Sequence, residues 1–162
     1  MFEIFNRADI SFNDKISASS GLLAVDEKVC ICRSSYESFD LLEYMGELLP
    51  EIISGIRYDE DSFAGYASIP KELERFLSNL ANYLIFRILS PAENENELRA
   101  RFGVILLSIG FILEAVLKLT REKSQVTIDD IAEIARVFSA EIEYSTENME
   151  ILISEFDFLL NF

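Results

Sequence analysis

The sequence predicts an all-α fold: a bundle of about five helices, preceded by an irregular or β-hairpin N-terminal arm. Apolar residues recur at three- and four-residue steps from Ser38 onward, which is the period of an amphipathic helix. Pro70 and Thr127 stand where two of these periodic segments begin, and both residue types favour helix starts. Half of the 162 residues are hydrophobic, so one sizeable core is expected. We therefore predict a single domain, with the arm over 1–35 and the helical bundle over 36–162.

The N-terminal arm is compatible with more than one local structure. GLLAV at 21–25 and VCICR at 29–33 are separated by a short polar turn, which fits a β-hairpin. A loose arm and a short helix over 10–24 are the alternatives. In a strand, Cys30 and Cys32 would face the same side. Two thiols are too few for a four-ligand zinc or iron–sulfur site within one chain. We therefore expect buried, reduced thiols, with a metal site shared across a dimer interface as the alternative.

Two helices separated by a loop are predicted in the next part of the chain. The apolar repeat over 38–53 indicates a first helix, which Pro50 bends or splits because proline lacks the backbone N–H. The acidic, glycine-containing segment 57–69 indicates a loop. A second helix is expected to start at Pro70 and to end near Ser90. Its predicted apolar face consists of Leu73, Leu77, Leu80, Leu84 and Ile88.

Tyr83 and Arg87 are polar residues within this apolar helix. They are four residues apart and therefore share one face, with Asn82 beside them. One interpretation is a half-buried tyrosine and an arginine whose head group reaches the surface or an acid. The other is a ligand-binding site in which Arg87 holds an anion or a substrate carboxylate.

A long third helix is expected over about 97–123. Its strongly apolar centre, 102–113, is too short to cross a bilayer, so we predict a buried core helix rather than a membrane span. Gly103 and Gly110 are seven residues apart and lie on one side of this helix. Glycines at these positions allow another helix to approach closely. A ligand slot beside them is the alternative.

Two further helices are predicted near the C-terminal end. Thr127 caps the first, and Ser145 or Thr146 caps the second. The apolar stripe of the first is Ile128, Ile131, Ala135, Phe138 and Ile142. The core stripe of the second is Met149, Leu152, Ile153, Phe156 and Leu160.

The last helix carries a second apolar stripe, formed by Ile151, Phe158 and Phe162. A surface helix needs only one apolar face, so this stripe is a candidate interface. A second copy of the chain would bury it in a symmetric homodimer. Alternatively, the N-terminal arm around Phe2–Phe5 folds over it within one chain.

Charge and residue counts exclude several classes of function. The net charge is −15, which argues against nucleic acid and anionic membranes as partners, because both are bound through Lys and Arg. A protein partner with a basic surface fits better. The absence of histidine excludes the usual Ser-His-Asp and Cys-His catalysis and His-containing zinc sites. No metal and no cofactor is predicted, and Glu141 and Glu143 are expected on a solvated face. No signal peptide is visible in the sequence.

Four pieces of the sequence occur in a familiar order: LANYLIFRIL at 80–89, the apolar helix at 102–119, VTIDDIAEIARVFSAEIEYSTEN at 126–148, and MEILI after it. They resemble the C-terminal helical region of the flagellin lysine-N-methylase family. In that family a phrase like ENYLVYR precedes a long helix, and a phrase like LTEEDLI…FSREIEHSEENLE follows it. Order, spacing and wording agree over a little under half of the chain.

This resemblance implies a bacterial cytoplasmic protein, related to enzymes that methylate lysine. The family carries a cysteine cluster toward its N-terminal side, thought to hold a metal or an iron–sulfur centre, whereas this chain has only Cys30 and Cys32. Where the family phrase has a histidine, this chain has Tyr144. We therefore expect a non-catalytic helical module that binds a protein partner or itself. The alternatives are a divergent or partial lysine methylase that needs a cysteine cluster from another chain, and a small-molecule-binding helical domain.

Overall fold

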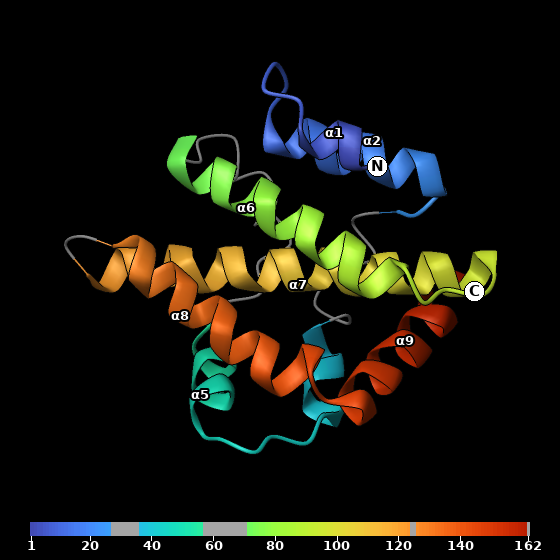
Figure 1. Cartoon of the computed structure of the whole chain (residues 1–162). Helices are drawn as coiled ribbons and strands as arrows, with labels where there is room; N and C mark the ends of the chain where they lie inside the picture. Colours follow the sequence, from blue (N-terminus) through green and yellow to red (C-terminus); the bar gives the residue numbers. More distant parts are fainter. Residues whose placement is uncertain (27–35, 57–70, 124–125, 162) are drawn as a thin grey trace.

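The long helix α7 (Glu95–Glu122) runs through the middle of the molecule, and the other helices pack around it (Figure 1). The computed structural model describes residues 1–26, 36–56, 71–123 and 126–161. Within these ranges every regular element is helical, which confirms the all-α prediction.

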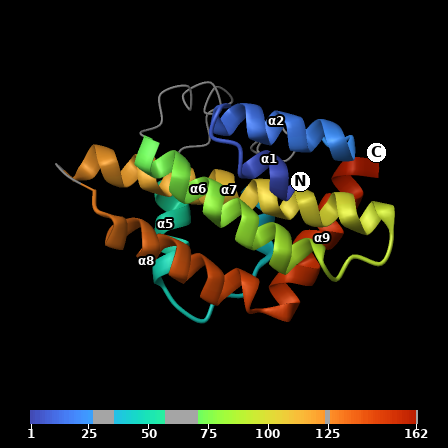
Figure 2. The same ribbon diagram turned by 45° about the horizontal axis from the view of Figure 1, so that its top comes forward.

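The helices lie on two sides of α7. On one side, α6 (Lys71–Leu84) contacts α7 and carries two N-terminal helices, α1 (Phe2–Phe5) and α2 (Phe12–Leu23). On the other side lie α5 (Leu48–Gly55), α8 (Ile128–Phe138) and α9 (Thr146–Asn161). Figure 2 shows the same arrangement from a second direction, with α2 beside α6 and with α8 across α7 from them.

The N-terminal arm is helical where it is described, which corrects the β-hairpin prediction. A capping box starts α2: Ser11 Oγ accepts from the Asp14 N–H at 3.2 Å, and the Asp14 carboxylate accepts from the Ser11 N–H at 3.3 Å. The helix then continues through residues 21–23, which a hairpin would need for its first strand. The alternative of a short helix over 10–24 is confirmed. The other predicted strand, with both cysteines, lies outside the described residues.

The described residues form seven α-helices rather than about five. The two additional helices, α1 and α2, occupy the arm. The predicted helix over 38–53 is also interrupted: a 3₁₀ turn, η1 (Ser38–Leu41), is followed by irregular chain and then by α5. Pro50 is the third residue of α5, in the first turn, where a backbone N–H has no intrahelical partner to lose. The predicted loop over 57–69 and Pro70 lie outside the described residues.

Tertiary hydrogen bonds hold the irregular segment between η1 and α5. The buried Asn148 side chain accepts from the Glu43 N–H at 3.0 Å and donates to the Glu43 carbonyl at 2.7 Å. Glu141 accepts from the Met45 N–H at 2.8 Å. These bonds satisfy backbone groups that a continuous helix would have paired internally, so the helical pattern of the sequence is overridden there.

Helix α7 is a core helix, as predicted. Residues 102–113 are all buried. The apolar part of α7 is longer than the predicted centre, and by length and composition alone the helix could cross a membrane. However, 83% of its 18-residue apolar window is buried inside the protein. Gly103 faces α9, because a Cβ built there would lie only 2.5 Å from the Phe156 ring. The two helices therefore approach closely at this position, and Gly110 is buried as well.

The predicted starts of α8 and α9 are confirmed. Thr127 Oγ1 accepts from the Asp130 N–H at 3.3 Å in a second capping box. Ser145 Oγ accepts from the Asn148 N–H at 3.2 Å. Ile128, in contrast, is exposed rather than part of the core stripe. The buried face of α8 is formed by Ile131, Ile134, Val137 and Phe138.

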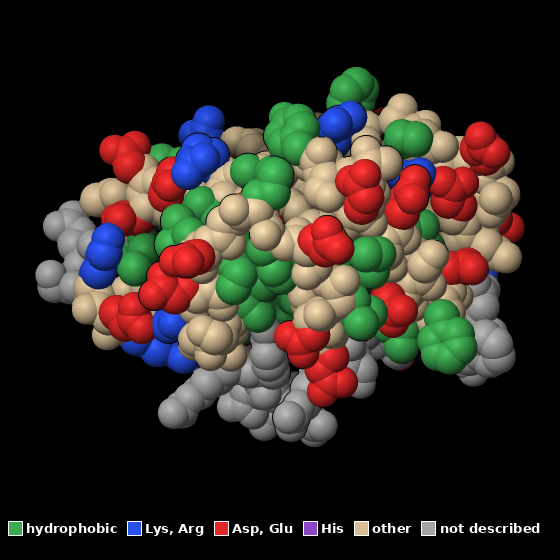
Figure 3. Space-filling model, turned by 90° about the horizontal axis from the view of Figure 1, so that it is seen from below, with side chains coloured by type: hydrophobic (Ala, Val, Ile, Leu, Met, Phe, Trp, Pro, Cys, Tyr) green, Lys and Arg blue, Asp and Glu red, His purple; other side chains and the backbone are tan. Residues whose placement is uncertain are grey.

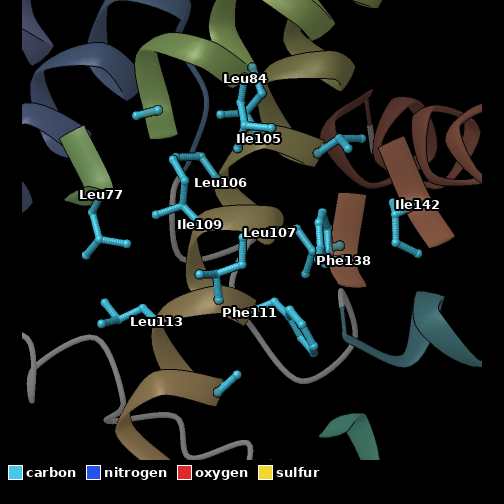
Figure 4. Packing of buried hydrophobic residues seen from close by; sticks show 14 of the residues in the cluster. Leu77, Leu84, Ile105, Leu106, Leu107, Ile109, Phe111, Leu113, Phe138 and Ile142 are labelled. Carbon is cyan, nitrogen blue, oxygen red and sulfur yellow. The ribbon is translucent and has the colours of Figure 1, made fainter. Parts of the chain in front are cut away.

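The core forms where α6, α8 and η1 meet α7. Figure 4 shows Leu77 and Leu84 on one side of α7, and Phe138 and Ile142 on another. Phe111 of α7 lies at the centre of an aromatic cluster, with ring centroids 5.3 Å from Phe39 and 5.3 Å from Phe138. Such ring pairs add stabilisation beyond the buried area.

Helix α9 presents its two predicted stripes differently. Leu152 and Phe156 are fully buried against α7. Of the second stripe, Ile151 is half-buried and packs on the core, Phe158 is 60% exposed, and Phe162 lies outside the described residues. The arm packs on α6, where Phe5 meets Phe12 at 6.1 Å between ring centroids.

Candidate functional site

Two wide helical turns bring the polar residues of the molecule's candidate site together. Helix α6 continues into a π-helical segment, η3 (Ile85–Leu89), and α8 continues into a second, η4 (Ser139–Glu143). Insertions of this kind are rare and occur often at functional sites. Here they place Arg87 of η3 opposite Glu143 of η4.

Glu143 is the centre of this site. Its Oε1 atom accepts a hydrogen bond from the Tyr83 hydroxyl at 2.5 Å and another from Arg87 Nε at 3.2 Å. The Glu143 side chain is 1% exposed, whereas that of Arg87 is 49% exposed. A buried carboxylate is costly unless it is paired, so Tyr83 and Arg87 together keep the charge inside the protein. The Arg87 head group also lies 5.7 Å from the centroid of the Tyr144 ring, within cation–π range.

The protonation of Tyr83 follows from this contact. The hydrogen bond to Glu143, assisted by burial, raises the pKa of the Tyr83 hydroxyl above its ordinary value. A phenol that donates to a carboxylate loses that bond on ionising. Tyr83 therefore stays protonated at neutral pH, where it acts as a hydrogen-bond donor and not as a base.

The two segments that carry the Arg87–Glu143 pair also carry three exposed aromatic side chains, Tyr83, Phe86 and Tyr144, which we call the aromatic rim. Phe86 is 70% exposed and Tyr144 is 67% exposed. Tyr83 is partly exposed and interacts with Tyr144. Large aromatic side chains gathered on a surface mark binding sites more often than isolated ones do.

Arg87 and Glu143 also line a pocket of about 220 Å³. Its polar lining consists of Arg87, Arg101, Glu143, Thr146 and Glu150. Its apolar lining consists of Ile88, Pro91, Met149 and Ile153. Glu143 Oε2 is buried and has no hydrogen-bond partner within the described part of the chain. Glu143 thus lines the pocket and carries one buried acceptor oxygen without a partner among the described residues, which is costly to leave unsatisfied.

A second pocket, of about 310 Å³, lies between α5, α7 and α8. Its lining is mainly apolar, with Leu48, Ile52, Ile134 and Val137, and with Lys118 and Lys123 at its edge. It contains no orphaned buried polar atom among the described residues, so we place the candidate site at Glu143.

The two residues predicted from sequence as a polar pair, Tyr83 and Arg87, do come together, and they share a partner that was not predicted. Glu141 and Glu143 are buried, which corrects the expectation of a solvated acidic face. Glu143 stands between the buried Ile142 and the exposed Tyr144. One signal for it was present: NYLIFR and SAEIEY, the two phrases of the resemblance, meet at this site.

The remaining predicted residues lie elsewhere. The ring of Phe156 occupies the space beside Gly103, so a ligand there would have to displace it. Gly110 is within the buried part of α7. Ile151 and Phe158 are on α9, away from the pair.

The described residues offer no metal site, since no group of three or more His, Cys, Asp or Glu side chains lies close enough to hold an ion. Cys30 and Cys32 lie outside the described residues. The cysteine cluster that the resemblance implies for the wider family has therefore no counterpart in this part of the chain.

No curated protein and no solved structure matches the chain. The family model of the FliB lysine N-methylase C-terminal domain matches residues 12–161. This match covers α2 through α9 and includes both π-helical segments and every residue of the candidate site. The chain therefore belongs to the family of FliB lysine N-methylase C-terminal domains.

Proposed function

We propose that this chain is a non-catalytic, protein-binding domain of lysine N-methylase type, and that its partner presents lysine or other basic side chains. The observation that carries the proposal is the aromatic rim on a strongly acidic molecule. The net charge of −15 attracts basic segments. Figure 3 shows one face of the molecule, where Asp and Glu side chains surround hydrophobic ones.

The aromatic rim suits a cationic side chain. Aromatic faces attract ammonium and guanidinium groups, with about 0.5–1 kcal/mol per contact at exposed sites. The rim already holds one cation in this way, because the Arg87 head group lies against the Tyr144 ring. A lysine of a partner would find Phe86 and Tyr144 exposed beside it.

The polar groups of the site support a binding role over a catalytic one. Glu143 is engaged by Tyr83 and Arg87, and Glu141 holds the backbone of Met45. Both carboxylates thus have structural tasks. The raised pKa of Tyr83 removes the nearest candidate for a base near neutral pH.

The second candidate function is a partial lysine methylase, completed by a cysteine cluster on another chain. The family match over 12–161 favours it, because C-terminal domains of this family belong to lysine methylases. In that case the rim would hold the substrate lysine for a reaction whose chemistry lies outside this chain. For either function we propose a bacterial cytoplasmic location, because the family resemblance implies it.

Fluorescence anisotropy with a labelled lysine-rich peptide tests the binding role. The matched ligand is the same peptide with every lysine acetylated, which removes the charge. We expect the lysine peptide to bind about 5- to 30-fold more tightly than the acetylated one, since two cation–π contacts contribute about 1–2 kcal/mol. The double variant Phe86→Ser with Tyr144→Ser should lose most of that difference.

Ile128→Ser is the matched control, because Ile128 is also an exposed hydrophobic residue but lies at the start of α8, outside the rim. It should bind the lysine peptide as the unchanged chain does. Equal binding of both peptides, or an equal loss in the rim variant and in Ile128→Ser, would overturn the proposal.

A further inference from the structure

We propose that the pocket at Glu143 binds a small zwitterion, a molecule with a free amino group and a carboxylate, such as an α-amino acid. This goes beyond the binding of a protein partner at the aromatic rim. The pocket lies between η3, α7 and the start of α9, and its volume of about 220 Å³ is below the ~300–1,000 Å³ of sites for drug-sized ligands. Its occupant is therefore small.

One side of the pocket is suited to an anion. Arg87 uses Nε for Glu143, and its two terminal nitrogens make no hydrogen bond within the described residues, which leaves them for a planar carboxylate. Arg101 also lines the pocket, although Glu97 and the Ile88 carbonyl hold its head group. Thr146 is the first residue of the 16-residue helix α9, so the positive end of that helix faces the pocket as well.

The other side of the pocket is suited to an amine. Glu143 is nine-tenths buried, lines the pocket, and has one oxygen, Oε2, with no hydrogen-bond partner in the described part of the chain. An ammonium group would supply the missing donor. The exposed Glu150 adds a second carboxylate to the lining.

Charge balance decides between the ligand classes. The ionisable lining consists of two arginines and two glutamates, so a simple anion would meet Glu143 and Glu150, and a simple cation would meet Arg87 and Arg101. Only a ligand with both charges satisfies both sides. Ile88, Met149 and Ile153 complete the lining, so an apolar side chain is expected on that zwitterion.

Ligand-detected NMR and calorimetry with three related compounds test this site. L-Leucine carries both charges, 4-methylpentanoate lacks the amino group, and 3-methylbutylamine lacks the carboxylate. We expect leucine to bind at least tenfold more tightly than either fragment. No leucine binding, or equal binding by one fragment, would overturn the proposal.

Two substitutions assign the binding to this pocket. Arg87→Gln should weaken leucine binding at least tenfold, because it removes the partner of the carboxylate. It should leave the binding of 3-methylbutylamine unchanged. Glu143→Gln should weaken leucine and leave 4-methylpentanoate bound at least as well as before. Arg136→Gln, at an exposed arginine of α8 that pairs with Glu133, is the control and should change nothing. If Glu143→Gln unfolds, which a thermal melt shows, the half-exposed Arg87 still decides: unchanged leucine affinity in Arg87→Gln contradicts the proposal.

Discussion

At the scale of single residues, the candidate site depends on one buried carboxylate, that of Glu143, which accepts hydrogen bonds from Tyr83 and Arg87. Tyr83 and Arg87 stood out because polar residues at i, i+4 in an apolar helix need partners. Their partner, Glu143, is 60 and 56 residues away along the chain, and the resemblance phrase that contains it does not distinguish it from the neighbouring Glu141. Tertiary packing buries Glu143, and the local sequence pattern carries no information about that packing.

Gly103→Ala should destabilise the fold by about 1–3 kcal/mol, the usual cost of overpacking a filled core. The added methyl group would lie 2.5 Å from the Phe156 ring, and that ring is fully buried in the core. Gly21→Ala is the matched control: it is a helical glycine with nothing within 4 Å of its Cβ position. There alanine should stabilise by up to about 1 kcal/mol through helix propensity. Denaturant midpoints give both values, and equal midpoints for the two variants would show that α7 and α9 are not in close contact.

At the scale of helices, the capping residues predicted where helices begin more reliably than the apolar period predicted where helices are continuous. Thr127 and Ser145 cap α8 and α9 as expected. These caps could be predicted because a capping hydrogen bond joins residues only three apart in the sequence. The apolar period over 38–53 predicted a helix that is interrupted, because Asn148 and Glu141, about a hundred residues further on, bind the backbone there. The π-helical segments were also invisible, since the apolar pattern passes through them unbroken.

The contribution of the α8 capping box to the stability of the fold should depend on pH in the acid range. A hydrogen bond from Lys123, then bonds from the Thr127 backbone and side chain, lower the pKa of Asp130 from 3.8 to about 2. A carboxylate with a folded pKa below its unfolded value stabilises above the unfolded pKa and loses that effect as pH falls through the folded pKa. The contribution should therefore be complete above about pH 5, fall as the pH drops through both pKa values, and vanish by about pH 1. An NMR pH titration of the carboxylate checks the value, and thermal melts should show the gap between the unchanged chain and Asp130→Asn closing over the same interval. A measured pKa near 3.8 would show that Asp130 is unpaired in solution.

At the scale of the whole molecule, the all-α class followed from helical period and caps, but the function did not follow from any residue pattern. The family was found through the wording of the segments 80–89 and 126–148, and these segments build the candidate site. The sequence did not decide between a hairpin and a helix in the arm, and it underestimated the number of helices, because α1 and α2 form where they pack on α6.

The whole molecule is also expected to associate with a second copy through α9. Phe158 is 60% exposed on an acidic molecule, and burying a phenylalanine side chain yields about 1.5–3 kcal/mol. We expect a symmetric dimer, in which both copies of the Ile151, Phe158 and Phe162 stripe are buried at once. The double variant Phe158→Ser with Phe162→Ser should halve the mass in light scattering and leave the helical circular dichroism signal unchanged. A monomer mass before and after the substitutions excludes the dimer.

The central claim, a lysine-binding domain that does not itself methylate, is tested most directly by mass spectrometry of a lysine peptide. The peptide is incubated with the purified chain and S-adenosylmethionine, beside a competent lysine methyltransferase with its own peptide as positive control. We predict no added methyl group on any lysine in the presence of this chain alone, since Tyr83, Glu141 and Glu143 are held in structural hydrogen bonds. A mass increase of one methyl unit that requires the chain, and that is lost in Tyr83→Phe, would contradict the account and make this domain a catalyst.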